Sequence, residues 1–334
     1  MIASVQFKHF KALRATSLRL EPFNLIIGPN GSGKTSLVQA FLRLRTLARQ
    51  QTGSAPAPMT ARAGGPEIVF RFPPPNADIE VHLACQNGPV CDVLQVRHPP
   101  ADEARARWEA LRTELGGIRA YLFDHYAMAE PAPLAEDGEL ASNGRNLAAV
   151  LAAMKRQRPE IFARLEAEFH RALPDFSAIE LPAAGEGRVL LALRLAEENA
   201  LITAENISQG ALYTLAILTL SFAPRPPTVL CLEEADRGMH PRLLREVRDA
   251  LYRLSYPADF GETRAAVQIV ATTHSPFLLD LFHDHPEEIV VASKQGRSAT
   301  FERLSDRPDV KEILREGSLG DIWFSGILGG VPEE

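Results

Sequence analysis

The segment GPNGSGKTS, residues 28–36, has the spacing of a phosphate-binding loop. An apolar run precedes it and a helix-like stretch follows it, which is the strand, loop and helix order that such a loop requires. Small residues let backbone N–H groups surround phosphate oxygens, and the helix N-terminus adds positive potential. The Lys34 ammonium suits β- and γ-phosphates, and the Thr35 hydroxyl suits Mg²⁺. The predicted phosphate contacts are Asn30, Gly31, Ser32, Gly33, Lys34, Thr35 and Ser36.

Two adjacent acids end a second apolar strand, in the segment VLCLEEADRGMHP, residues 229–241. This arrangement is typical of a Walker B motif. Glu233 would hold Mg²⁺ together with Thr35, and Glu234 would polarise the attacking water as a general base. The alternative is a strand that ends in two solvated glutamates.

Two further motifs are informative because of where they lie relative to the predicted strands and helices. In ATTHSP, residues 271–276, His274 follows the next apolar strand, where it would face the ligand crevice of an α/β sheet and donate to a γ-phosphate. In ISQG, residues 207–210, Ser208 is a candidate N-cap and Gly210 allows close backbone approach. The apolar helix that follows would direct its positive end at a phosphate.

The periodicity of the chain predicts an α/β fold with a mixed central sheet. We expect strands at residues 2–8, 15–20, 23–27, 67–72, 79–85, 90–97, 118–123, 228–232 and 267–271, with a hairpin over 176–182 and 188–195. Helices are expected at 102–115, 142–156, 159–172, 210–222 and 241–256, and loops at 51–66 and 124–141. The short turns between strands 67–97 indicate an antiparallel N-terminal subdomain, and alternating strands and helices over 208–282 indicate parallel strands. The tail, 286–334, should add two strands and one or two helices.

We expect a single domain, 1–334, in three parts: a lobe 1–123, a short helical insertion 124–175 and a lobe 176–334. The 334 residues are 46% apolar and 23% charged, which is ordinary for a globular protein. No apolar run is long enough for a membrane span and no signal peptide opens the chain, so a cytoplasmic protein without a membrane partner is expected.

The net charge of −6 gives no electrostatic argument for nucleic acid, although a local basic stripe would still allow it. The three cysteines form no C-x-x-C pair and indicate neither a disulfide framework nor a zinc site.

The order of the motifs GPNGSGKTS, ISQG, LCLEEADRGMHP and TTHSP resembles an ABC-type ATPase of the SMC/RecF/OLD group. More narrowly, it resembles the compact predicted ATPases of that group often found in bacterial anti-phage operons. The opening FKHFKALRATSLRLEPFNLIIGPN is similar to the group's first hairpin, and LGDIWFSGILGGVP is similar to the end of the compact branch.

The resemblance implies the ABC ATPase head, a P-loop NTPase fold, and a homodimer or higher oligomer that holds two ATP molecules between heads. One head would contribute the phosphate loop, both Walker B acids and His274, and the other the signature residues Ser208 and Gly210. Residues 236–240 would be the D-loop that crosses the interface. ATP with Mg²⁺ would then act as a switch in anti-phage defence or DNA repair, with slow or regulated hydrolysis, over a separate effector such as a nuclease or a toxin.

Three departures from the group's pattern affect this interpretation. Gln209 stands where the signature usually has an acidic residue or glycine, and Asp236 stands where the compact branch usually has Glu. No Q-loop glutamine is evident, and Asp124 and His125 are the candidates for its place.

Other functions remain as alternatives. The motor subunit of an ABC transporter is disfavoured by the 174-residue interval from Lys34 to Ser208, which is longer than in such motors, and by the paired glutamates. A nuclease-active OLD-like protein is disfavoured because the 60 residues after His274 hold no acidic cluster. A long-armed chromosome protein would need a longer coiled coil than the interval between the motifs allows.

Overall fold

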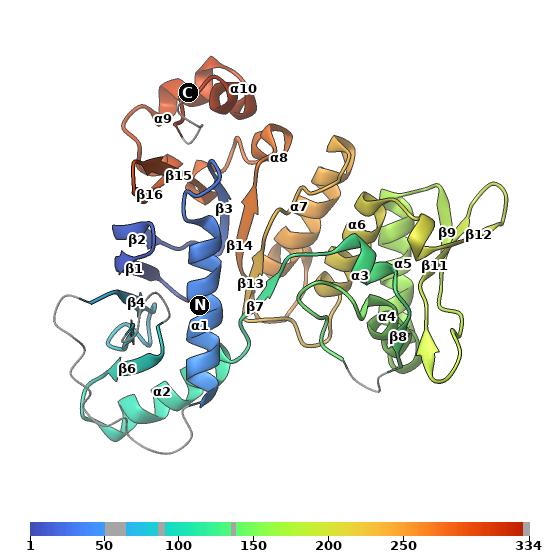
Figure 1. Cartoon of the computed structure of the whole chain (residues 1–334), viewed down its shortest axis with the longest axis horizontal. Coiled ribbons are helices and arrows are strands. Elements are labelled where there is room, and N and C mark those ends of the chain that lie inside the picture. The colour runs from blue at the N-terminus through green and yellow to red at the C-terminus, as the bar shows by residue number, and fades with distance from the viewer. Residues whose placement is uncertain (51–64, 86–90, 135–137, 330–334) are drawn as a thin grey trace. The chain divides into compact units, whose positions relative to one another are not determined.

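The computed structural model describes residues 1–50, 65–85, 91–134 and 138–329, which form two compact units (Figure 1). Unit 1 comprises residues 1–120, 227–234 and 264–334, and unit 2 comprises residues 121–226 and 235–263. The units divide the chain at points other than the three expected parts. The region after residue 176 and the helix after the Walker B acids group with the helical insertion.

The first sheet of unit 1 is antiparallel throughout and has the order β2-β1-β4-β5-β6. Its strands are β1 (Ser4–Phe10), β2 (Leu13–Arg19), β4 (Glu67–Arg71), β5 (Glu80–Ala84) and β6 (Val93–Arg97). The predicted N-terminal antiparallel subdomain is therefore confirmed. Of the predicted loop 51–66, residues 51–64 lie outside the described part of the chain.

The second sheet is mixed and has the order β16-β15-β3-β14-β13-β7. Its strands are β3 (Phe23–Ile27), β7 (Arg119–Tyr121), β13 (Val229–Leu232), β14 (Gln268–Thr273), β15 (Ile289–Gln295) and β16 (Ser298–Arg303). Strands β13, β14, β3 and β15 run parallel to one another, and β16 is antiparallel to β15. This confirms the parallel strands predicted from the alternating pattern.

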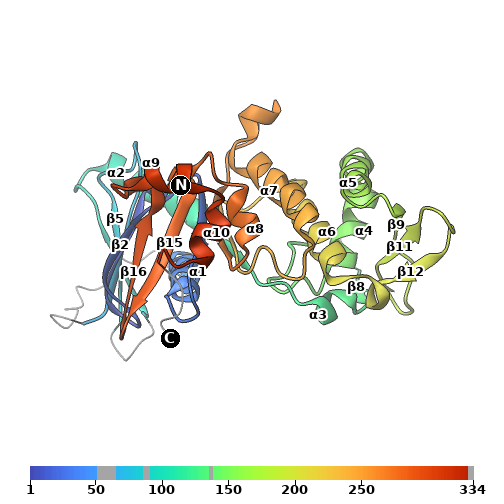
Figure 2. The same ribbon diagram turned by 90° about the horizontal axis from the view of Figure 1, so that it is seen from above.

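Helices cover these sheets and complete unit 1. They are α1 (Lys34–Gln50), α2 (Asp102–Leu115), α8 (Pro276–Asp280), α9 (Val310–Glu316) and α10 (Leu319–Phe324), with short 3₁₀ turns η3 (Pro286–Glu288) and η4 (Leu304–Asp306). One core joins α1 and α2 to both sheets, and it includes Phe7, Ile26, Phe41, Phe70 and Val270, all fully buried. Helix α10 packs beside α8 (Figures 1 and 2), where Gly320 lies against Pro276.

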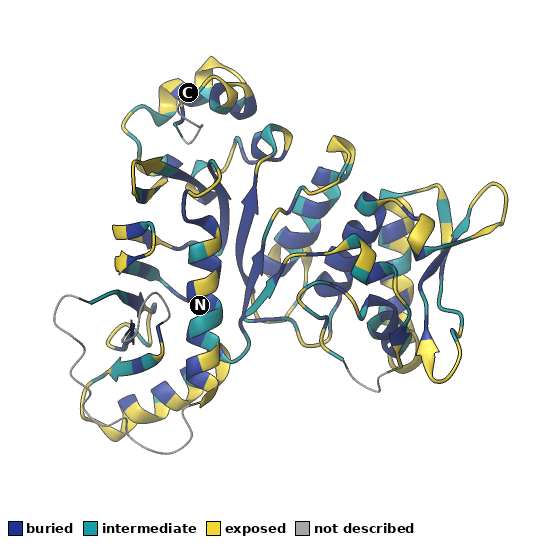
Figure 3. Ribbon diagram, in the orientation of Figure 1, coloured by how far each residue is buried: buried dark blue, intermediate teal, exposed yellow. Residues whose placement is uncertain are grey.

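Unit 2 is built around three helices, α5 (Pro159–Ala172), α6 (Gln209–Ser221) and α7 (Pro241–Ser255). Helix α6 packs against both of the others and is buried along nearly its whole length (Figure 3), whereas α7 is strongly amphipathic. The remaining elements are α3 (His125–Ala129), α4 (Leu147–Gln157), β8 (Ala132–Pro133), β9 (Phe176–Glu180), β10 (Arg188–Val189), β11 (Ala192–Leu195), β12 (Leu201–Thr203), η1 (Ala204–Asn206) and η2 (Pro257–Phe260).

Local predictions in unit 2 need three corrections. The predicted loop 124–141 contains helix α3, because Asp124 caps it by accepting a hydrogen bond from the Ala127 N–H. The helix expected from residue 142 begins at Leu147. In the predicted hairpin, β9 does pair with β11, but β10 pairs with β8 instead, so the second half of the hairpin is split between two sheets.

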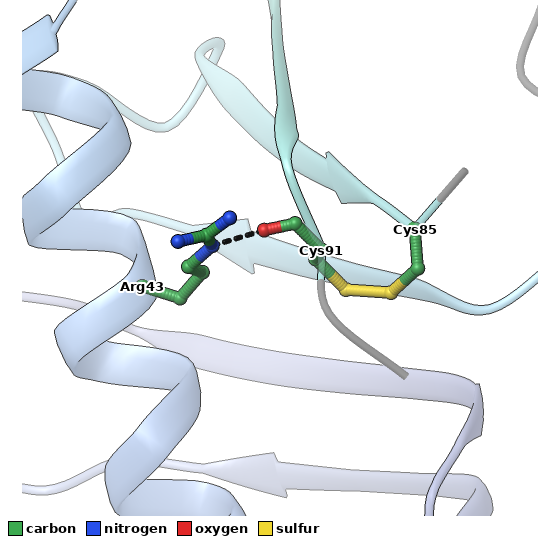
Figure 4. The surroundings of a disulfide bond; sticks show 3 residues. All are labelled: Arg43, Cys85 and Cys91. Carbon is green, nitrogen blue, oxygen red and sulfur yellow. Dashed lines mark hydrogen bonds between the residues drawn. A yellow bond between two sulfur atoms is a disulfide. The ribbon is translucent and has the colours of Figure 1, made fainter. Parts of the chain in front are cut away.

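The cysteine prediction is also wrong, because Cys85 and Cys91 form a disulfide (Figure 4). Cys85 follows β5 and Cys91 precedes β6, so the antiparallel pairing of these two strands brings the cysteines together. Arg43 of α1 donates a hydrogen bond to the Cys91 carbonyl. The third cysteine, Cys231, is fully buried in β13, and burial raises the pKa of its thiol, as is typical of an unreactive core cysteine.

Candidate nucleotide-binding site

A cavity of about 210 Å³ lies in unit 1 where β3, β13 and β14 end. The carboxyl ends of neighbouring parallel strands form one edge of a sheet, which is where α/β proteins place their ligands. Its lining residues are Lys11, Ala12, Asn30, Gly31, Gly33, Lys34, Thr35, Ser36, Glu233, Glu234, Thr272 and His274. Three motifs that are far apart in the sequence therefore meet in one cavity.

The phosphate loop is held in place by close packing on both sides. Gly28 has φ +150°, and a Cβ there would lie 2.1 Å from the Ala292 carbonyl oxygen of β15. Gly33 has φ +92°, and a Cβ there would lie 2.6 Å from the Leu13 side chain. Both positions therefore require glycine, for backbone conformation and for space. The loop is packed between β15 and the start of β2.

Lys34 is buried and directed at the backbone of its own loop. Its Nζ donates to the Gly28 carbonyl at 2.7 Å and to the Pro29 carbonyl at 2.9 Å. Burial lowers the pKa of Lys34 from 10.5 to about 8, although the charges of Glu234 and Glu233 act in the opposite direction. A polyphosphate in the cavity would supply the negative charge that this buried ammonium lacks.

A hydroxyl and a carboxylate meet beside the loop. Thr35 Oγ1 donates to Glu233 Oε2 at 2.7 Å, although the two residues are 198 positions apart. Oxygen donors of these two types are the ligands that Mg²⁺ takes next to a nucleotide. They fit a metal held jointly by protein and phosphate. A cage built from protein alone is not evident, because no group of three or more His, Cys, Asp or Glu residues in the described ranges could hold a metal ion.

Glu234 has a strained backbone. Its φ of +52° is in the left-handed region, which a non-glycine residue seldom adopts. Its N–H donates to Thr272 Oγ1 at 3.0 Å, so strand β14 helps to hold the turn after β13 in this conformation. Such strain concentrates at functional sites. The exposed His274 follows β14 and lines the same cavity.

The signature residues lie in unit 2. Ser208 is the N-cap of α6, as predicted, because its side chain accepts from the Ala211 N–H. Gly210 is buried beside the D-loop, and a Cβ there would lie 2.9 Å from the Gly238 carbonyl oxygen. Gly238 has φ +65°, and a Cβ there would lie 2.6 Å from the Gln209 side chain. Signature and D-loop thus form one packed surface.

Nine of the predicted site residues line the cavity, and Ser32 is the phosphate-loop residue that does not. Its buried hydroxyl has no hydrogen-bond partner within the described residues. Among the polar lining residues, sequence reasoning missed Lys11 and Thr272. The first belongs to the opening hairpin and the second to the ATTHSP strand, so both were in segments already singled out, but nothing in their spacing marked them as cavity residues.

The fold matches solved structures of Smc head domains. One is described as "Crystal structure of the SmcHead bound to the C-winged helix domain of ScpA", with TM-score 0.56 and 14% identity over 90% of this chain and 97% of that one. Another is the Smc head domain with an extended coiled coil bound to the C-terminal domain of ScpA, from Pyrococcus furiosus. Its TM-score is 0.57, with 15% identity over 94% and 99% of the two chains. A comparison with curated proteins gives no match.

The chain has the fold of the SMC head domains, which confirms the resemblance to the SMC/RecF/OLD group. The chain belongs to the family described as "AAA domain, putative AbiEii toxin, Type IV TA system", whose sequence model matches residues 23–280. Among the described helices, none has the length and apolar content needed to cross a bilayer.

Proposed function

We propose that this protein binds and hydrolyses ATP in a dimer and uses the nucleotide as a switch over a separate effector. One observation carries the proposal: Lys34, Glu234 and His274, from three distant motifs, line a single cavity. Lys34 provides charge for the β- and γ-phosphates, and Thr35 with Glu233 would hold Mg²⁺, which neutralises phosphate charge when bound.

Within this cavity the residues have separate roles. Glu234 is exposed, and its turn is fixed by Thr272, so its carboxylate accepts a proton from an attacking water. His274 donates to the γ-phosphate from the end of β14. Ser208 is exposed at the N-terminus of α6, where a helix end and a hydroxyl suit a phosphate bound by a second copy of the chain. The switch is ordered while the γ-phosphate is present and released after hydrolysis.

The biological role is argued from the relatives. The structures of SMC heads are described as bound to ScpA domains, so a head of this fold can carry a protein partner. The family description refers to toxin–antitoxin systems. We therefore place this chain in anti-phage defence or DNA repair in the cytoplasm, acting on a nuclease or toxin encoded as another chain.

The dimer is tested with Glu234→Gln, which keeps the pocket but removes the base. With ATP and Mg²⁺ this variant should accumulate as a stable dimer in size-exclusion chromatography with light scattering. Lys34→Ala should stay monomeric because it does not bind ATP. Glu186→Gln, the same chemical change at an exposed position in unit 2, should behave as the wild type. A monomeric Glu234→Gln protein at saturating ATP and Mg²⁺ would refute the sandwich.

A further inference from the structure

Two sets of hydrogen bonds connect the segment that follows β7 to the signature segment, residues 207–210. His125 Nε2 lies 3.0 Å from the Ile207 carbonyl oxygen, one residue before Ser208. A carbonyl can only accept, so Nε2 carries the hydrogen and His125 is the donor. In the second set, Gln209 Nε2 donates to Tyr213 Oη at 3.0 Å, and Tyr213 Oη donates to the Phe123 carbonyl at 2.6 Å.

These bonds fix the direction of the signature backbone. The peptide unit between Ile207 and Ser208 is planar, and its C=O and N–H point in opposite directions. Holding the Ile207 oxygen therefore also sets the direction of the Ser208 N–H. Since Ser208 caps α6, the same constraint orients the positive end of that helix.

The Gln209 side chain makes its contacts within unit 2. It is bonded to Tyr213, and it is packed so closely against Gly238 that a Cβ there would lie 2.6 Å away. This residue is one of the three departures from the group's sequence pattern. Through these contacts with Tyr213 and Gly238, Gln209 helps to hold the signature and the D-loop together.

We propose that His125 is a positioning residue for the signature, and that the Gln209–Tyr213–Phe123 chain assists it. The proposal rests on the function proposed above, and names the residues that orient Ser208 toward a nucleotide bound by a second copy. Asp124 caps α3 by accepting a hydrogen bond from the Ala127 N–H. Asp124 and His125, the candidates for the place of the Q-loop glutamine, are therefore both hydrogen-bonded to backbone groups of unit 2. His125 then acts on the partner's nucleotide through Ser208, without touching it.

The first test separates binding from turnover. His125→Ala should lower kcat about ten-fold, the order expected for one lost hydrogen bond in a catalytic geometry, with ATP affinity unchanged because the cavity lies in unit 1. His125→Gln places an amide donor at similar reach and should restore most of kcat. His170→Ala is the matched control. It removes a histidine–carbonyl bond of the same kind, to Phe176 at 2.7 Å, elsewhere in unit 2, and should leave kcat unchanged.

The second test is complementation between copies. His125→Ala lacks a working signature and Glu234→Gln lacks the base, so each homodimer is impaired. In a mixed dimer, the cavity of the His125→Ala chain faces the intact signature of the other chain, and hydrolysis should return. Tyr213→Phe, which removes only the bridging hydroxyl, should lower kcat in the same direction and be complemented in the same way. If His125→Ala does not fold, Tyr213→Phe still allows the complementation test.

The outcomes distinguish the two proposals. A His125→Ala protein with wild-type kcat, a His125→Gln variant no better than alanine, or a mixture that stays inactive would each overturn the positioning role while leaving the ATP-dependent dimer intact. A wild-type protein that neither dimerises with ATP nor hydrolyses it would overturn the proposed function, and this inference with it.

Discussion

Lys34 is the residue whose charge depends most on whether the cavity is filled. Burial places its pKa at about 8, below the 10.5 of a solvated lysine. Between these two values the unfolded chain holds a proton that the empty folded site does not, so the stability of the nucleotide-free protein should rise with pH over this window. Phosphate oxygens favour the charged ammonium and reverse the shift.

ATP binding should therefore be accompanied by proton uptake at a pH above 8, and affinity should weaken as pH rises from there. Isothermal titration calorimetry in two buffers of different ionisation enthalpy, with Mg²⁺ saturating, measures the uptake directly. At a pH well below 8 Lys34 is already charged, so the uptake should vanish. Affinity that stays constant across pH 8 with no proton exchanged would contradict the assignment of this lysine.

At the scale of elements, one face of the antiparallel sheet carries a set of paired ionisable side chains. His82 lies between two carboxylates, 2.6 Å from Glu67 and 3.2 Å from Glu80. Arg71 lowers the pKa of Glu80 through a hydrogen bond of 2.7 Å. Burial alone would raise the pKa of Glu67, but hydrogen bonds from His82 and Lys8 outweigh it, and the pKa is lowered.

A lowered carboxyl pKa stabilises the fold above the ordinary value of 4.5, and this contribution is lost as pH falls through the folded pKa. The melting temperature should therefore drop below pH 4.5, and a Glu67→Gln/Glu80→Gln variant should show a smaller drop. Thermal denaturation followed by circular dichroism measures both. Glu186→Gln/Glu198→Gln makes the same change at exposed positions and should keep the wild-type pH dependence. Identical acid profiles for all three proteins would exclude this sheet face as a source of acid sensitivity.

At the scale of the whole molecule, the nucleotide cavity belongs to unit 1 and the signature with the D-loop to unit 2. In the residues that the structure describes, no cluster of acids, histidines or cysteines offers a second metal site for DNA cleavage. The function proposed above assigns the output of the switch to another protein.

Purified protein should accordingly leave supercoiled plasmid uncut in the presence of Mg²⁺ and ATP, as judged by agarose gel electrophoresis. Lys34→Ala protein, purified in parallel, shows whether any cleavage depends on ATP binding, and a second purification removes contaminating nuclease. Mg²⁺-dependent cleavage that persists in Lys34→Ala protein after a second purification would mean that the nuclease lies in this chain, and the idea of a separate effector would fail.

Much of the fold was predictable because its signals are local. Helices α2 and α5 have the expected bounds, and the strands for which a position was predicted in the two sheets of unit 1 lie within a few residues of it. The missed elements depend on distant partners. Strand β10 pairs with β8, 55 residues earlier at Arg188 and Pro133, and no local pattern specifies that pairing.

By itself the sequence determined which side chains to expect at the site, because a phosphate loop and a Walker B motif are runs of adjacent residues with a recognisable spacing. Tertiary structure decided what surrounds them. The pairing of β14 with both β3 and β13 brings the three motifs to one edge and gives Glu234 its support from Thr272. The connection between the paired strands β1 and β2 contributes Lys11 to the cavity. The tertiary structure also brings Cys85 and Cys91 together in a disulfide and His125 within hydrogen-bond distance of the Ile207 carbonyl. These contacts link residues whose proximity depends on strand register and helix packing, which short sequence windows do not encode.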